Sequence, residues 1–133
     1  MVTKEQVYDA TLNSLNTVWA AVSTAADSWA KTPNMASAQA TLSVKSILTM
    51  AANDIRAVMT QLSSAEKKAR TVVDDVVIRL DAYKKALAGV ASGEELVDTW
   101  KRSVQSMLDD MMQHAPEVLK QQSFQTLLRK LAA

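Results

Sequence analysis

The side chains that carry most enzyme chemistry are nearly absent from this chain of 133 residues. It has no Cys, one His (His114) and two Gly, Gly89 and Gly93. Zinc sites and nucleophile–base pairs need several Cys, His or acidic groups that converge, and a lone His does not supply them. Two isolated glycines cannot form a loop that cradles phosphate. We therefore predict that the protein is not an enzyme and holds no metal and no cofactor.

The titratable residues that remain have plainer explanations. His114 lies on an apolar helical stripe before Pro116, and we expect a core or helix-end imidazole rather than a pH switch or a base. Three pairs of adjacent carboxylates suggest acid–base work, namely Asp74–Asp75, Glu94–Glu95 and Asp109–Asp110. Neighbouring residues of a helix do not face each other, however. Several of the acidic residues have a Lys or Arg four positions away, as in Asp75–Arg79. This spacing predicts a solvated surface with salt bridges instead.

The composition favours an all-helical chain of one domain. Hydrophobic residues make up 48% of the chain but aromatic residues only 5%, so the core is aliphatic. Two Gly and two Pro leave little turn chemistry, which a β or α/β fold would need in quantity. A length of 133 residues fits a single domain with one core.

Apolar residues recur at alternating steps of three and four, the spacing of one helical face. This spacing predicts helices over residues 4–31, 35–62, 65–90, 93–114 and 117–131. Thr3 is the expected N-cap of the first helix, and Pro33 follows its end. Trp19 falls on the apolar face of that helix and is expected in the core. The predicted fold is all-α: an antiparallel bundle of four main helices plus a short C-terminal helix.

The junction between the second and third helices allows two structures. Ser63 and Glu66 match a capping box, which predicts a turn and a helical hairpin. The stretch nevertheless lacks Gly and Pro and keeps its apolar phase, so one continuous helix over residues 35–90, roughly 80 Å long, is the alternative. We favour the turn. Ser92 and Glu95 form a second capping box, which predicts the start of the fourth helix.

Charged residues are unevenly distributed along the chain, and the functional prediction is based on this distribution. Residues 1–62 hold eight charged side chains, whereas twenty-one lie in residues 63–133. The polar faces of the first two helices are therefore mostly Ser, Thr, Asn and Ala, which suit close contact with another surface. The favoured function is a helical interaction or assembly subunit that self-associates or docks into a larger complex. The candidate contact residues are Ser28, Trp29, Ser43 and Met112.

Two other functions stay open. Long amphipathic helices rich in Ala, Ser, Thr, Gln and Met suit a coat on a lipid or polymer surface. Over residues 4–90 the composition and helix length resemble phasins, the coat proteins of polyester storage granules. A small helical subunit of a nucleoprotein complex is the third possibility, and nucleic acid is the less favoured partner because acidic residues interleave with the basic ones. Its candidate basic patch is Lys67, Lys68, Arg70, Lys84 and Lys85.

Charge and hydropathy along the chain indicate the compartment. The net charge is +1, which steers toward no class of charged partner. No short apolar segment follows the charged N-terminus, as it would in a signal peptide. The apolar runs are too short to span a bilayer. We expect a cytoplasmic protein.

Overall fold

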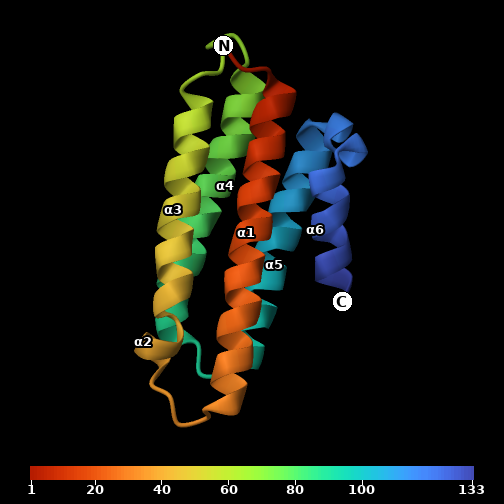
Figure 1. Ribbon diagram of the computed structural model, residues 1–133. Helices are drawn as coiled ribbons and strands as arrows, with labels where there is room; N and C mark the ends of the chain where they lie inside the picture. Colours follow the sequence, from red (N-terminus) through yellow and green to blue (C-terminus); the bar gives the residue numbers. More distant parts are fainter.

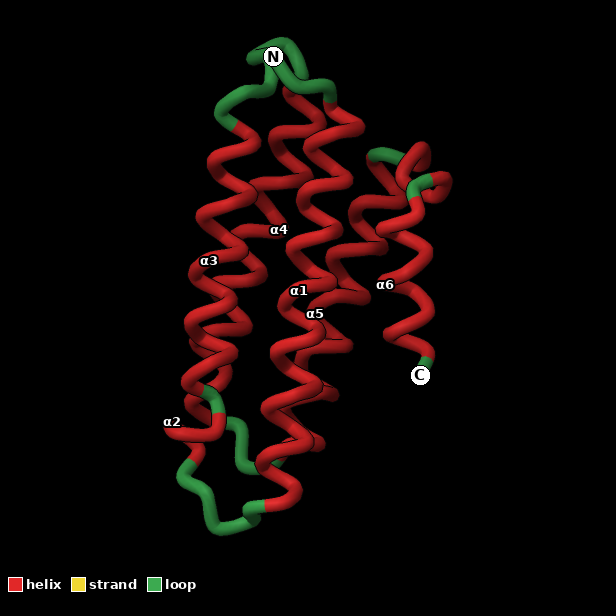
Figure 2. Tube along the Cα trace, viewed as in Figure 1, coloured by secondary structure: helices red, strands yellow, loops and turns green.

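The computed structural model describes all 133 residues and confirms the predicted all-α bundle (Figure 1). The helices are α1 (Lys4–Lys31), α2 (Ser37–Ala40), α3 (Leu42–Met59), α4 (Lys67–Ala86), α5 (Gly93–His114) and α6 (Gln122–Ala132). Two 3₁₀ turns lie at Leu87–Gly89 and Pro116–Lys120. The long helices α1, α3, α4 and α5 lie side by side, and the connecting loops gather at the two ends of the bundle (Figure 2). The shorter α6 packs along α1.

The first helix begins and ends where the sequence predicts. The Thr3 hydroxyl accepts a hydrogen bond from the Gln6 backbone N–H, and the Gln6 side chain accepts one from the Thr3 N–H. This reciprocal pair satisfies two donors that the first turn leaves free. The helix stops at Lys31, two residues before Pro33. The expected range of 4–31 is thus confirmed.

The second predicted helix, 35–62, is wrong in its extent. The structure divides it into α2 and α3 at Thr41, whose buried hydroxyl donates to the Ser37 carbonyl at 2.8 Å. The backbone of Thr41, at φ −98° and ψ 0°, departs from helical geometry and separates the two helices. The helix also ends at Met59, and Leu62 instead lies beside Val2, whose N–H donates to the Gln61 carbonyl.

The turn between α3 and α4 is confirmed, so the continuous-helix alternative is wrong. The Lys84 ammonium reaches back to the Thr49 hydroxyl at 2.6 Å, as an antiparallel hairpin requires. The predicted capping box does not form, however. The Ser63 hydroxyl accepts from the Ala65 N–H instead, and α4 begins at Lys67, two residues later than expected.

The C-terminal segment also differs from the expected helix 117–131. It consists of a 3₁₀ turn, an extended residue at Gln121, and α6. Polar contacts hold α6 on α1, because the Ser123 hydroxyl donates to Asp9 at 2.6 Å and the Asn16 amide donates to the Ser123 carbonyl at 3.2 Å. The third and fourth helices follow the prediction more closely, since only the last turn of the third tightens to 3₁₀ and Ser92 caps α5.

One core of 33 buried apolar residues runs through all the long helices. Trp100 is its largest side chain, fully buried with its ring centroid 5.1 Å from that of Tyr83. The expectation that Trp19 is a core residue is wrong: Val18 takes the inward position, and Trp19 lies half-buried with the Lys101 ammonium 5.7 Å from its ring. Strict steps of three and four repeat every 3.5 residues on average, whereas an α-helix has 3.6 residues per turn. Over the 28 residues of α1 this difference accumulates, so the pattern assigns the inward position to Trp19 instead of its neighbour Val18.

Candidate interaction surface

Ser28 and Ser43, the two serines predicted to contact a partner, are both exposed. Helical spacing places them on the sides of α1 and α3 that lie next to each other. On α1, Ser28 lies one turn beyond Thr24 and three turns beyond Thr17, and Thr17 lines a groove with residues of α3. A shallow groove lined by Ser14, Thr17, Ile47, Met50 and Asp54 joins the two helices on this side. The two predicted positions therefore belong to one surface.

This surface, called here the α1–α3 face, is nearly uncharged. On α1 it comprises Asn13, Ser14, Thr17, Ala20, Ala21, Thr24 and Ser28, and on α3 it comprises Ser43, Ser46, Ile47, Met50, Asp54 and Ala57. Its charged residues are Asp54 and, at the end of α1, Lys31, which lies on the stripe of Thr24. Two other charges of these helices turn elsewhere, since Asp27 lines a pocket with Asp98 of α5 and Arg56 lines a groove with Lys84 of α4.

One large apolar side chain, that of Met50, stands out from the α1–α3 face and is 56% exposed. Leu42 is 64% exposed but lies seven residues from Thr49, on the stripe of α3 that turns toward α4. The sequence-based candidate contact residues did not include Ser46 and Met50. The available signal was that both lie off the buried stripe of Val44, Leu48, Ala51 and Ile55.

The other two predicted contact residues do not offer the expected surface. Trp29, predicted to contact a partner, is only 5% exposed. The reason lies at Gly93, where the absent side chain lets the start of α5 approach Ala26 and cover the end of α1. Trp29 instead lines part of a pocket of about 460 Å³ between these two helix ends. Met112 is half-buried and packs against the core beside the fully buried Met111.

The five residues of the predicted basic patch do not come together. Lys67 and Lys68 lie at the start of α4, whereas Lys84 and Lys85 lie at its end, roughly 25 Å away at 1.5 Å per residue. Arg70 turns back to donate to the Leu62 carbonyl at 2.8 Å, so it stabilises the α3–α4 turn. Lys85 pairs with Asp81 at 3.1 Å. These contacts leave no continuous basic stripe.

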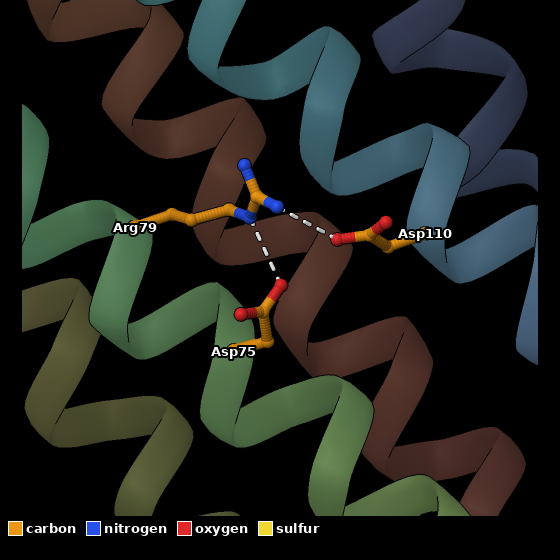
Figure 3. A network of polar contacts seen from close by, with 3 residues as sticks. All are labelled: Asp75, Arg79 and Asp110. Carbon is orange, nitrogen blue, oxygen red and sulfur yellow. Dashed lines mark hydrogen bonds and ion pairs between the residues drawn. The ribbon is translucent and has the colours of Figure 1, made fainter.

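The most developed polar network joins α4 to α5 through Arg79 (Figure 3). Its guanidinium donates from Nε to Asp75 and from Nη2 to Asp110, each at 2.9 Å. These residues line a groove of about 420 Å³, in which His114 also takes part. His114 is exposed, so the expected core imidazole is wrong, although its place in the last turn of α5 matches the helix-end alternative.

The network predicts a small acid-dependent loss of stability. The hydrogen bond from Arg79 holds the pKa of Asp75 below its usual range. A carboxylate with a lowered folded-state pKa contributes stability above its unfolded pKa of about 3.9 and loses it as the pH falls through the folded value. Because both side chains are more than one third exposed, the contribution is less than about 1 kcal/mol. Asp75→Asn should flatten the decline of unfolding free energy below about pH 4.

The exposed pair of Asp81 and Lys85 gives the control for that measurement. Urea unfolding at several pH values should show no comparable flattening for Asp81→Asn. An Asp75→Asn protein that loses stability toward low pH as steeply as the wild type would contradict the assignment.

The two tyrosine side chains, Tyr8 and Tyr83, are both buried. Burial raises the pKa of Tyr8 to about 12 and also raises that of Tyr83, whose hydroxyl donates to the Leu96 carbonyl at 2.9 Å. Both phenols therefore stay protonated near neutral pH. No three His, Asp or Glu side chains converge closely enough to hold a metal ion, and no helix has the length and apolar character needed to cross a membrane.

No protein-family model, curated protein sequence or solved structure matches this chain.

Proposed function

We propose that this protein is a non-enzymatic helical interaction subunit that docks into an assembly through the α1–α3 face. The observation that carries the proposal is the scarcity of charge on one exposed surface, where Met50 is 56% exposed and the charged residues are Asp54 and, at the end of α1, Lys31. Exposed helical surfaces in solution usually carry Lys and Glu in quantity. The other long helices of this bundle do so, as α4 and α5 hold most of the charges.

The side chains of the α1–α3 face lower the cost of association. Ser, Thr and Ala lose little rotamer freedom when they are covered, whereas Lys and Glu lose more and must also be desolvated. Their small size lets a partner backbone approach closely. Met50 supplies apolar area at the contact, and Met adapts its shape to an irregular surface. These properties support a protein contact over a solvated face.

The same properties favour a protein partner over a lipid or polymer coat. Helices that lie in a membrane interface usually combine a wide apolar face with Lys and Arg along its borders. The α1–α3 face instead places Met50 among hydroxyl groups, which find partners on a protein. A nucleoprotein role would depend on the basic residues of α4, and these are separated or already paired. Partitioning of the protein into liposomes or oil droplets would favour the coat.

The test introduces charge into the face. The double variant Ser28→Glu/Ser43→Glu places two carboxylates at exposed positions off the core. It should keep the unfolding free energy within about 0.5 kcal/mol of the wild type. Assembly should weaken by about tenfold or more, because each carboxylate has to be desolvated in the contact. Light scattering and recovery of the native complex measure the effect.

A matched variant adds the same charge elsewhere. Ala82 on α4 and Gln113 on α5 are exposed and lie off the α1–α3 face, so Ala82→Glu/Gln113→Glu should assemble as the wild type does. If both double variants keep the wild-type size distribution and recover the native complex equally well, the α1–α3 face is ordinary solvent-exposed surface and the proposal fails.

A further inference from the structure

A groove between α1 and α5 continues beyond the end of α6. Figure 1 shows α6 beside one end of α1, on the side away from α3, and its last turn lies about halfway along the bundle. The Lys101 ammonium marks this point, because it donates to the Ala133 carbonyl at 2.9 Å and lies 5.7 Å from the centroid of the Trp19 ring. Past this point α1 continues to Lys31 and α5 continues back to Gly93, with no third helix over them on that side.

The floor of this open groove consists of small and apolar side chains. On α1 its stripe runs from Asn16, whose amide contacts α6, through Trp19 at steps of three and four, the spacing of one helical face. Its further members are Ser23, Ala26 and Ala30, and Val97 lies opposite on α5. All of these except the exposed Ala30 are half-buried. The stripe from Trp19 to Ala30 is about 16 Å long, which is the length of an 11-residue helix such as α6.

The far end of the open groove is acidic. It widens into the pocket of about 460 Å³, whose lining includes Asp27, Glu94 and Asp98 and no Lys or Arg. None of these three carboxylates forms an ion pair within the protein. The same pocket is lined by Ala26 and Val97, so unpaired negative charge adjoins the apolar floor. A partner that fits this end has to combine apolar side chains with positive charge.

We propose that the open α1–α5 groove docks a short amphipathic helix of a partner protein, with an apolar stripe and Lys or Arg beside it. The neighbouring part of the same groove shows what it accepts, because α6 packs there with Phe124 and Leu127 fully buried. α6 also carries Arg129 and Lys130 in its last turn. A partner helix that continues in the direction of α6 would bring such a basic turn to the acidic end of the groove.

This inference goes beyond the proposed function, because the groove lies on a different side of α1 from the α1–α3 face. The apolar stripe of the partner helix supplies the contact area, as in other helix-in-groove complexes. The opposite charges fix its position along the groove and exclude acidic helices. A helix of about three turns covers little surface, so the contact is weak and exchanges rapidly.

The sequence of α6 itself is the probe. A fluorescent, amidated peptide of residues 121–133 should bind the protein saturably below about 1 mM, with low affinity because the free peptide has to fold as it binds. The same peptide with Arg129→Glu/Lys130→Glu should bind about tenfold more weakly. The protein variant Asp27→Lys/Asp98→Lys, altered at two exposed positions, should reverse this preference and select the acidic peptide. Fluorescence anisotropy measures all four combinations.

A matched variant and a second peptide serve as controls. Asp74→Lys/Asp81→Lys makes the same change of net charge at exposed positions of α4 and should keep the wild-type preference for the basic peptide. A peptide with Phe124→Ser/Leu127→Ser keeps its positive charge and should lose at least tenfold in affinity, because the apolar stripe is gone.

Three results would overturn the inference. The basic peptide does not bind, the Asp27→Lys/Asp98→Lys protein still prefers the basic peptide, or the serine-substituted peptide binds as well as the original. The Ser28→Glu/Ser43→Glu protein should bind the basic peptide within about twofold of the wild type, since those positions lie outside the groove. The groove and the α1–α3 face are therefore tested by separate variants, and either contact can fail while the other stands.

Discussion

Replacing Trp100 with alanine should lower the free energy of unfolding by about 3–5 kcal/mol, the usual range for a large buried aromatic side chain. Trp100 is fully buried in α5 and its ring lies against Tyr83. Alanine would leave a cavity between α4 and α5 that the packed core can only partly fill. Urea unfolding, followed by far-ultraviolet circular dichroism, measures the loss.

Two further variants separate burial from ring chemistry. The Trp100 Nε1–H has no hydrogen-bond partner, and a buried donor without a partner costs about 1–3 kcal/mol. Trp100→Phe keeps an apolar ring and removes this donor, so its loss should be much smaller than that of Trp100→Ala. Trp19 is only half-buried, and Trp19→Ala should cost about 1–2 kcal/mol. Equal losses for Trp19→Ala and Trp100→Ala would contradict the position of the core.

Gly93→Ala should also destabilise the protein, by about 1–3 kcal/mol or more. A Cβ at this position would lie 2.7 Å from the carbonyl oxygen of Ala26 and 3.1 Å from its Cα. Both atoms belong to the backbone of α1, so the helices must move apart. The intrinsic preference of helices for Ala over Gly, about 1 kcal/mol in a helix interior, acts in the opposite direction and is outweighed.

The second glycine provides the control. A Cβ at Gly89 meets no atom within 4 Å, and its backbone has no positive φ. Gly89→Ala should therefore be neutral or stabilise by about 0.4–1 kcal/mol, because the unfolded chain loses freedom. Thermal unfolding of both variants decides the matter. A Gly93→Ala protein as stable as Gly89→Ala would show that α1 and α5 do not approach each other this closely.

The sequence predicts the fold class well because apolar periodicity and capping residues act locally. The Thr3 cap and the loop before Gly93 lie where their sequences indicate. The break at Thr41 is harder to predict, since no Gly or Pro marks it and threonines also lie inside the unbroken helices α1 and α4. The burial of Trp29 depends on the approach of α5, a contact between residues more than sixty positions apart, and no local signal reports it.

The candidate surface was predictable only in outline. The low charge of residues 1–62 indicates that some face is unusual, and exposed Ser28 and Ser43 are consistent with it. Which residues join across two helices depends on how α1 and α3 are rotated against each other. That rotation brings Met50 beside Thr17 and turns Arg56 toward α4. The basic residues of α4 likewise look like one group in the sequence. In the structure they lie at opposite ends of a 20-residue helix.

The methyl resonance of Met50 reports whether the α1–α3 face forms the contact. Methionine methyl groups can be observed by NMR while the protein is titrated from dilute to concentrated solution, or with its native complex. A contact through the α1–α3 face should shift or broaden the Met50 signal, whereas the signals of the fully buried Met107 and Met111 should stay in place. If the assembly forms and the Met50 resonance does not change, the contact lies elsewhere on the bundle and the account is wrong.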